Sequence, residues 1–583
     1  MASDAVAVLD YTPIRLDFSK LSLEEQCEAI WAETIKQERA EERIRRRPPV
    51  VLVWDGEWRL QHVIATEYKA QFSWISNDSG PGQTTLPFDC PAAQWIHDME
   101  GRINRGDKRN VHVTVDHCGA RWGGRLDQSH VKLEEDGDKA LEVTWLHDYE
   151  NLKWYTVRSN PFLPEWFQFP RAMILAGPVP WLLKTALWMQ LFRENGPTWR
   201  FPDDPLSLDS WGQSVNNVFS QAQWHIVCQP GDFFTCVNNG EIWGVVSSRW
   251  SNFHDMARPM LEDGEYSVDV RRWITGDPPP WPGAQLRSGA LVVDVINKSG
   301  FLLGTSHGGT VFDGLMLTAA EFGEAFIDTV TAGYLNQSDL APTVKENYEI
   351  PGVFKTQREL PYAIYREGDQ SAIQTAEFVV SPCKGFAVST GGHSMPGVNE
   401  AISASIQALG GLLGSLFMMG SLGGTIDTLL KPLYEDVLLA FQHTWSAERA
   451  ANSGWDRYHE YWQDGAGKAY TIASLMVLRA GFWATKTVIS CKVSVLDGAP
   501  FRVGDRGLGH HWLDDRIGVV LKDDITGRIY MDRCRKIDLS WDETSPAEWL
   551  LTIGDDRMLQ DPAQRAWGKI ESMVGALREL GMY

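Results

Sequence analysis

The sequence predicts a β-rich α+β protein of several domains, and three observations support this fold class. The chain has 583 residues, which is enough for about four domains of ordinary size. Most of its apolar runs are short, rich in β-branched and aromatic residues and bounded by turn residues, as strands are. Helical patterns are fewer, and they frame or interrupt the β regions instead of alternating with single strands.

The composition limits which ligands the protein can attract. The chain has 54 basic and 76 acidic residues, so its net charge is −22 at pH 7. This balance excludes broad electrostatic attraction to DNA, RNA or anionic lipid, because such binding needs clustered Lys and Arg. The 26 Trp residues outnumber the 23 Phe residues, which predicts extensive core or intersubunit contacts, where Trp is favoured.

The N-terminus and the cysteines indicate a protein made in a reducing compartment. Asp4, Asp10 and Asp17 interrupt the start of the chain, which lacks the continuous apolar core of a secretory signal. The eight cysteines are dispersed and include no C-x-x-C pair. Neither a structural zinc site nor a disulfide framework is therefore predicted.

Residues 1–49 are predicted to form an N-terminal helical arm. A helix is expected over residues 22–47, because Ser22 and Glu25 form a capping box and arginines fill the last turn. The two prolines at positions 48 and 49 end this helix.

Residues 50–158 are predicted to form a first β domain. Two apolar runs flank Asp55-Gly56, which is a signal for a tight hairpin ending near Trp58. One short helix is expected at residues 90–99, since Pro91 suits a first helical turn. Further strands are expected at residues 67–75, 110–116 and 140–149.

Three further units are predicted after residue 158, apart from an insertion at residues 399–486. Residues 159–284 form a mixed domain rich in Pro and Trp, which ends near the extended connector 278–282. Residues 285–398 form the first part of a second β domain, which residues 487–545 complete as a small barrel. Helices are expected at residues 181–193 and 318–334 and in a C-terminal helical unit at 546–583, and strands at residues 224–228, 233–237, 241–246, 290–297, 362–365, 376–380, 488–496, 516–522 and 528–538.

Residues 399–486 are predicted to be an apolar, Gly-rich and helical insertion. Between Glu400 and Asp427 lie 26 uncharged residues, more than the roughly 20 that a bilayer span needs. Six glycines weaken a helix in this segment. Two alternatives stay open: the segment packs inside an oligomer, where small residues permit close approach, or it is a concealed membrane-active segment. The large apolar residues that would carry either role are Leu409, Leu412, Leu413, Leu416, Phe417, Met418, Met419 and Leu422.

An aromatic cluster follows this apolar segment. Helical patterns are expected on both sides of it, at residues 428–443 and 468–485. Its aromatic side chains suit either alternative, because Trp and Tyr anchor apolar segments at membrane interfaces and also dominate protein interfaces. The cluster comprises Trp445, Trp455, Tyr458, Tyr461 and Trp462.

Patterns typical of enzymes and metal sites are weak in this sequence. Ser306 lies in a G-x-S-x-G string, but glycines delay the helix that must follow a nucleophile elbow. Cys90 stands at an expected helix start with His112 and His117 downstream, yet no orienting residue is evident. The adjacent pair His510-His511 has no spacing suited to one metal ion. No catalytic residue, cofactor or metal is therefore predicted.

Short motifs along the chain resemble a known family. They include Val53-Trp-Asp-Gly-Glu-Trp58, Val113-Thr-Val-Asp-His-Cys-Gly-Ala-Arg-Trp122, Gly308-Gly-Thr-Val-Phe-Asp-Gly314, Ser453-Gly-Trp-Asp-Arg-Tyr-His-Glu-Tyr461, Asp497-Gly-Ala-Pro-Phe-Arg-Val-Gly504 and residues 72–87 and 92–96. With these motifs, residues 45–540 resemble the large minor tail proteins, or tail-tip (baseplate) hubs, of siphophages that infect actinobacteria.

The resemblance implies a structural virion protein made in the host cytoplasm and placed at the tail tip. It implies a homotrimeric hub with barrel-like β domains and helical insertions, in contact with the distal tail protein ring, the tape-measure protein and other minor tail proteins. Such a hub closes the tail tube and opens for genome ejection, so DNA passes it without specific binding. Contact with the host membrane through residues 401–426 is a further expectation. The alternatives are a tail-associated cell-wall or ester hydrolase using Ser306 or Cys90, and a carbohydrate-binding adhesin using surface Trp.

Overall fold

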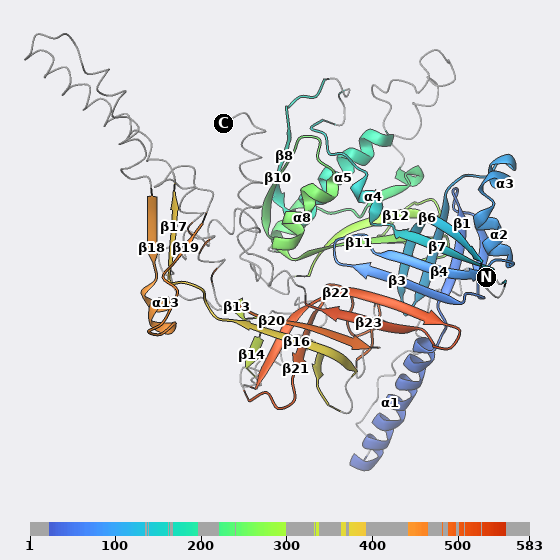
Figure 1. Ribbon diagram of the computed structural model, residues 1–583. Helices are drawn as coiled ribbons and strands as arrows, with labels where there is room; N and C mark the ends of the chain where they lie inside the picture. Colours follow the sequence, from blue (N-terminus) through green and yellow to red (C-terminus); the bar gives the residue numbers. More distant parts are fainter. Residues whose placement is uncertain are drawn as a thin grey trace, which may run out of the picture.

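Figure 1 shows a computed structural model of the chain. It describes residues 22–133, 137, 139–160, 163, 167–195, 221–239, 241–298, 331–332, 334–336, 363–368, 372–391, 441–463, 478, 481, 485, 488–496, 501–506, 508–525 and 527–554. The predicted segment 401–426, the string around Ser306 and the C-terminal helix after Asp561 lie outside these residues.

The protein is β-rich, as predicted, and its largest element is a 15-stranded sheet with the main strand order β13-β20-β23-β22-β3-β4-β7-β6-β5-β1-β2. Strands β14, β15, β16 and β21 attach beside this path. The strands of the N-terminal part are β1 (Val50–Asp55), β2 (Leu60–Ile64), β3 (Lys69–Ile75), β4 (Pro81–Pro87), β5 (Val111–His117), β6 (Ala120–Leu133) and β7 (Lys139–His147). Those of the C-terminal part are β13 (Thr331–Ala332), β14 (Tyr334–Asn336), β15 (Ala363–Arg366), β16 (Ile373–Ser381), β20 (Val488–Leu496), β21 (Arg516–Val520), β22 (Arg528–Asp542) and β23 (Glu548–Ile553).

One strand pair joins the two ends of the chain in this sheet. Strand β22 pairs antiparallel with β3, so that Leu539 lies opposite Phe72 and Ile537 opposite Trp74. The regions predicted as a first β domain and as the completion of a second are therefore hydrogen-bonded neighbours. A pairing of such long sequence separation leaves no local signal, because hydrophobic periodicity reports a strand but not its partner.

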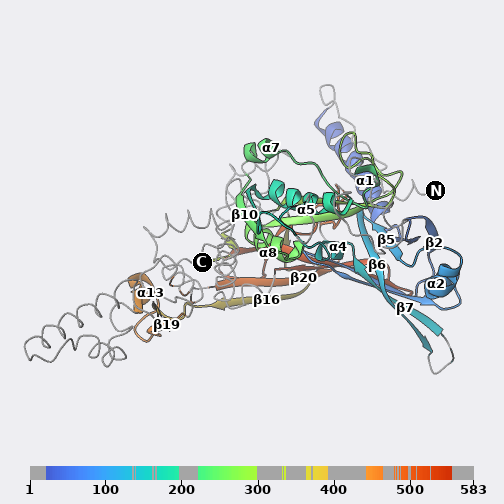
Figure 2. The ribbon, with the colours of Figure 1, turned by 90° about the horizontal axis from the view of Figure 1, so that it is seen from above.

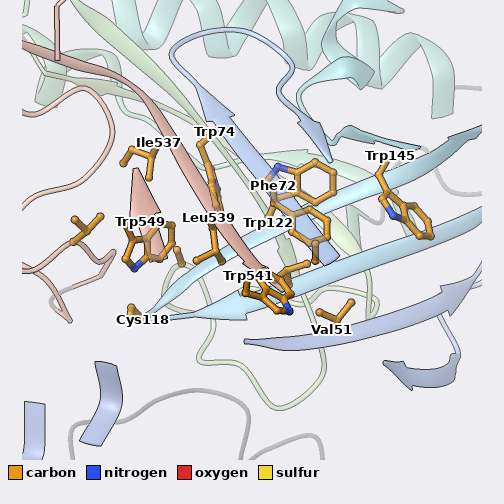
Figure 3. Packing of buried hydrophobic residues seen from close by; sticks show 14 of the residues in the cluster. Val51, Phe72, Trp74, Cys118, Trp122, Trp145, Ile537, Leu539, Trp541 and Trp549 are labelled. Atoms are coloured by element: carbon orange, nitrogen blue, oxygen red, sulfur yellow. The ribbon is translucent and has the colours of Figure 1, made fainter. Parts of the chain in front are cut away.

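The core under this sheet is rich in tryptophan. Trp122 is fully buried and packs against Phe72, with ring centroids 4.9 Å apart. Trp549 from β23 packs in the same cluster beside Trp74, at 5.5 Å. Figure 3 shows these rings gathered between strands from both ends of the chain. A buried indole N–H usually has a hydrogen-bond partner, and that of Trp122 donates to the carbonyl of Ser73 at 2.9 Å.

A second unit, residues 149–298, has its own apolar core. In it, helices α5 and α8 pack on the three-stranded sheet β11-β12-β9 and on the pair β8–β10, and they lie together in Figure 2. Its helices are α4 (Glu150–Lys153), α5 (Val179–Asn195), α7 (Phe233–Asn238) and α8 (Phe253–Gly264), with the short 3-10 turn Gln221–Gln223. Its strands are β8 (Met173–Pro178), β9 (Ile226–Cys228), β10 (Trp243–Ser248), β11 (Tyr266–Trp273) and β12 (Ala290–Asn297).

The third unit is a small sheet of strand order β18-β17-β19 with the short helix α13 (Ala447–Asn452). The strands are β17 (Ala387–Gly391), β18 (Phe441–Trp445) and β19 (Glu460–Trp462). It lies at one end of the molecule, away from β1–β7, in both Figure 1 and Figure 2. The chain therefore presents this sheet apart from both large cores.

The N-terminal helix α1 (Leu23–Arg45) confirms the predicted capping box. The Ser22 backbone N–H donates to the Glu25 carboxylate at 2.8 Å, and the Glu25 N–H donates to Ser22 Oγ at 3.4 Å. Reciprocal bonds of this kind satisfy two amide groups that the first helical turn leaves without partners.

Several local predictions are wrong. The expected strand at 233–237 is helix α7, because the Asp232 carboxylate caps it by accepting the Thr235 N–H at 2.8 Å. The single helix expected at 90–99 is two, α2 (Pro91–His97) and α3 (Met99–Asn104), since Asp98 ends the first and caps the second.

The hairpin after Asp55 is wider than predicted, because Trp58 lies in the turn at φ 60° and β2 begins at Leu60. The helices expected at 318–334 and 428–443 are wrong at their C-terminal ends, which are strands β13 and β18. Both ends form backbone pairs with strands distant in sequence, β20 and β17, and such pairs override a local helical pattern.

Candidate functional site

The small sheet brings most of the predicted aromatic cluster to one place. Trp445 lies at the end of β18, and Tyr461 and Trp462 lie in β19. Trp455 and Tyr458 lie in the loop between α13 and β19, where Trp455 is 97% exposed. The predicted residues of the apolar segment, from Leu409 to Leu422, lie outside the described residues.

One face of this sheet is aromatic at its ends. Side chains two apart on a strand share a face, so Phe441, His443 and Trp445 stand together on β18. Phe441 is 57% and Trp445 58% exposed. On the other side of the central strand, Trp462 of β19 approaches Phe441, with ring centroids 6.1 Å apart. Tyr461 alternates to the opposite face, so it does not belong to this group.

The centre of the same face is polar. Ser389 of β17 lies opposite His443 in one register and opposite Trp462 in the other. Its hydroxyl is 2.8 Å from His443 Nδ1, and it donates to Glu460 Oε2 at 2.7 Å. The hydrogen bond from Ser389 holds the pKa of Glu460 below its usual value, so this carboxylate is charged at neutral pH.

We name these six residues the aromatic surface: Phe441, Trp445 and Trp462 with Ser389, His443 and Glu460. The polar three do not form the relay of a serine hydrolase, which needs the serine and the acid on different ring nitrogens of the histidine. Here Glu460 Oε2 approaches the same Nδ1 atom that Ser389 contacts, at 3.3 Å. These three side chains can accept and donate hydrogen bonds. Because Ser389 and Glu460 approach the same ring nitrogen, His443 is not placed to take the Ser389 proton on one nitrogen while Glu460 holds the other.

Sequence reasoning missed Phe441 and the three polar residues of this surface. The signal was present, because residues 441–445 alternate aromatic and polar side chains as a half-buried strand does. The apolar helical pattern upstream of residue 441 concealed it.

A second feature, strand β11, connects the large sheet to the second unit through buried polar groups. We name it the β11 interface, meaning β11 with Glu265 and the partners that hold it. The Asn77 side chain donates to the carbonyl of Tyr266 at 2.8 Å and accepts the N–H of Val268 at 2.9 Å. Arg516 donates to both carboxylate oxygens of Glu265, at 2.8 and 2.9 Å. Both contacts come from one guanidinium nitrogen, Nη2, and hydrogen bonds between two charged groups are among the strong ones.

Asp514 is the central residue of the β11 interface. Its carboxylate is fully buried and accepts hydrogen bonds from Ser76 at 2.5 Å and Ser267 at 2.6 Å, two residues that are far from it and from each other in sequence. The Arg533 guanidinium lies 2.9 Å from it. Burial alone would raise the pKa of Asp514, but Arg533 and Arg535 outweigh it and lower that pKa. The carboxylate therefore stays charged inside the protein.

Asp148 and Arg272 form a further buried ion pair of this interface. Arg272 donates to the two carboxylate oxygens at 2.9 and 2.6 Å, and its guanidinium stacks over Trp58 at 4.6 Å. Burial opposes ionisation, yet the positive charge of Arg272 lowers the pKa of Asp148. Neither charge is exposed to water, so each depends on the other.

The residues of the hydrolase alternative that uses Cys90 do not assemble. Cys90 caps helix α2, and its sulfur accepts the Ala93 N–H at 3.4 Å. The downstream histidines lie elsewhere in the core: His112 stacks on Trp58 at 4.7 Å, and His117 lies 5.4 Å from Trp549. Burial lowers the pKa of His112 to about 3 and that of His117 to about 4, so both are neutral packing residues.

The adjacent histidines point to different partners. His511 Nε2 lies 2.6 Å from the Tyr365 hydroxyl, whereas His510 Nδ1 accepts the Arg502 N–H at 3.0 Å. Within the described ranges, His, Cys, Asp and Glu nowhere gather in threes in a way that could hold a metal ion. Over the same ranges, every helix is too short or too polar to cross a bilayer.

Comparison with known proteins finds relatives over nearly the whole length of the chain. The family model of Siphovirus ReqiPepy6 Gp37-like proteins matches residues 50–555. The chain is 29% identical to Minor tail protein Gp28 of Mycobacterium phage D29, over 96% of the chain and 98% of that protein. It is also 29% identical to Minor tail protein Gp28 of Mycobacterium phage L5, over 97% of the chain and all of that protein.

Among solved structures, the chain resembles a tail protein from Neisseria meningitidis MC58. The sequences are 9% identical, the match covers 89% of this chain and 99% of that one, and the TM-score is 0.35.

Proposed function

Because the chain belongs to the Siphovirus ReqiPepy6 Gp37-like family of tail proteins, we propose that it is the trimeric hub of the tail tip. The chain is a phage minor tail protein and a structural component of the virion tail. In the proposal, three copies close the tail tube, organise the tip and open for genome ejection. The observation that carries it is the family match over residues 50–555, together with similarity to minor tail proteins over nearly their full length.

A hub must be a rigid body that withstands the load of an attached tail. Two features support this role. Strand β22 pairs with β3 inside the large sheet, so both ends of the chain share one core. The β11 interface then joins the second unit to this sheet through ion pairs shielded from water. Separating a buried ion pair is energetically unfavourable, because each group is then left as an uncompensated buried charge.

The proposed contacts of the hub are two further copies of the chain, the distal tail protein ring, the tape-measure protein and other minor tail proteins. DNA passes through the hub and is not bound specifically. The charge of −22 on each copy supports this, since a negative duct repels a polyanion. A role without catalysis, cofactor or metal is part of the proposal.

The apolar segment 401–426 is proposed to lie sheltered near the three-fold axis and to meet the host membrane after the tip opens. Its length and lack of charge support this. The two strands that flank it in sequence, β17 and β18, pair with Gly391 opposite Phe441. The chain therefore leaves β17 and enters β18 at the same end of the small sheet.

The copy number and position are tested directly. Light scattering of the purified full chain should give three times its mass of 65.6 kDa, and antibodies against it should label the distal tail end of virions in electron micrographs. A strictly monomeric protein in solution and in detergent-dissociated virions would contradict the trimer, and labelling along the tail shaft would contradict the tip.

The membrane role is tested by flotation of the full chain, before and after mild heating that opens the assembly, with phosphatidylcholine vesicles that contain or lack an anionic lipid. Binding is expected after opening. Binding should fall when Leu412 and Phe417 are both replaced by Asp. The matched control is Leu133→Asp, since Leu133 is already exposed on β6. If both variants float as the wild type does, segment 401–426 is not the membrane contact.

A further inference from the structure

The aromatic surface places aromatic rings and hydrogen-bonding groups side by side on one exposed sheet face. Its two ends are flat, exposed rings, and its centre is a hydrogen-bonded Ser389, His443 and Glu460. Exposed aromatic patches on a soluble protein usually mark a binding surface. The polar centre favours a ligand that offers hydrogen-bonding groups between apolar ones.

The dimensions of this face fit an elongated ligand. Side chains two apart on a strand lie about 7 Å from each other, so Phe441 and Trp445 bracket a length of about 13–14 Å along β18. Trp462 widens the Phe441 end, where the two rings meet. A ligand lying along the strand would contact an aromatic ring at each end and the polar group in the middle.

Sugars have this distribution of chemistry. A sugar ring presents an apolar C–H face, which packs on an aromatic ring, and hydroxyl groups around its edge. Hydroxyls are good donors to a carboxylate, and hydrogen bonds to a charged acceptor are the strong ones. Glu460 and His443 are each about half exposed on this face, so both are within reach of such groups.

Charge discriminates between the possible ligands. The centre of the surface carries the Glu460 carboxylate, and the whole chain carries −22. Phosphorylated polymers, nucleic acids and anionic lipid headgroups are therefore repelled. A second copy docking the same face in a two-fold contact would bring two Glu460 carboxylates together. A neutral, hydroxyl-rich ligand is not repelled by the negative charge, and it does not bring a second carboxylate next to Glu460.

We propose that the aromatic surface on β17, β18 and β19 is a binding site for a neutral polysaccharide chain. Trp445 and the Phe441–Trp462 pair stack against sugar rings at the two ends, and Glu460 and His443 bind hydroxyl groups between them. The proposal goes beyond the hub role and does not depend on it, because it concerns only the small sheet.

The test uses the purified full chain and four neutral hexasaccharides: cellohexaose, maltohexaose, a 1→5-linked arabinofuranose hexaose and a galactofuranose hexaose. Calorimetry and Trp fluorescence should detect binding of at least one of them. Trp445→Ala should weaken that binding at least about tenfold, and Glu460→Gln by a similar factor of about ten, since it removes a charged acceptor without changing its shape. Trp445→Phe should keep most of the affinity.

The matched control is Trp455→Ala, which removes an exposed Trp of the same unit that lies in the loop before β19. It should leave binding unchanged. Failure of all four sugars to bind at millimolar concentration overturns the proposal, and so does equal loss of binding in Trp445→Ala and Trp455→Ala. Flotation with neutral or anionic vesicles that depends on Trp445 would assign the surface to a membrane instead and would likewise overturn it.

Discussion

The large sheet and the small sheet use tryptophan in opposite ways. In the large sheet, Trp122 and Trp549 are buried, and strands from both ends of the chain surround them. In the small sheet, Trp445 and Trp455 face water. The same residue type therefore stabilises the core of one region and is available for binding on the other. The difference lies in how many strands and helices cover each ring.

The difference follows from how much surface each sheet can cover. In the large sheet, the pairing of β3 with β22 joins strands from both ends of the chain, and hydrogen bonds to β11 hold this sheet against the second unit. Within the described residues, the small sheet has three strands and one short helix. Phe441 and Trp445 on one of its faces are more than half exposed, so these rings are available to a ligand.

Replacing Trp122 by Ala should give the largest effect on stability. The change removes a fully buried indole and its hydrogen bond to Ser73, which should cost about 3–5 kcal/mol in the free energy of unfolding. Urea unfolding followed by far-UV circular dichroism measures it. A loss below about 1 kcal/mol would mean that the core can collapse around the cavity, and the contrast between the sheets would then be weaker than described.

Asp514→Asn should come next and tests whether the β11 interface is as important as the apolar core. The substitution keeps the shape of the side chain but leaves Arg533 buried with less compensation, which should cost about 3 kcal/mol. The comparison variant is Asp505→Asn, whose carboxylate lies 3.6 Å from Arg271 nearer the surface. Equal midpoints for the wild type and Asp514→Asn in thermal unfolding would show that the buried charges contribute little.

Acid should weaken the large sheet through its buried histidines. Burial lowers the pKa of His117, His147 and His511 to about 4, whereas an unfolded chain protonates histidine near pH 6.5. Their stabilising effect is therefore complete above pH 6.5 and is lost as the pH falls towards 4, by about 1.4 kcal/mol per pH unit for each histidine.

Unfolding midpoints at pH 7 and pH 4.5 measure this loss. His117→Asn should reduce the slope between them by the share of one histidine. A pH-independent midpoint over this range would show that these rings are not buried neutral groups.

Trp445→Ala should give the smallest effect on stability, within about 0.5 kcal/mol, because a surface side chain loses few contacts when it is truncated. The same variant is expected to lose sugar binding. A destabilisation of several kcal/mol would show instead that Trp445 is covered in the assembled protein, and the two sheets would then use tryptophan alike.

Much of the local structure was accessible from the sequence. The helix capped by Ser22 and Glu25, the helix around Trp181 and the apolar strand at 290–297 carry their signals within a few residues. Family membership was likewise recognisable from short motifs such as residues 53–58. The expected strand at 233–237 failed because the cap at Asp232, an interaction of a single side chain, outweighed the apolar run.

What the sequence determined by itself is what depends on neighbours along the chain: helix caps, strand periodicity, net charge and family motifs. The tertiary structure alone decided that β3 meets β22, that Asp514 gathers Ser76 and Ser267, and that Ser389, His443 and Glu460 share a face with Trp445. These contacts join residues far apart in sequence. Their formation is governed by burial and charge compensation in the folded chain, and no local pattern reports either of these.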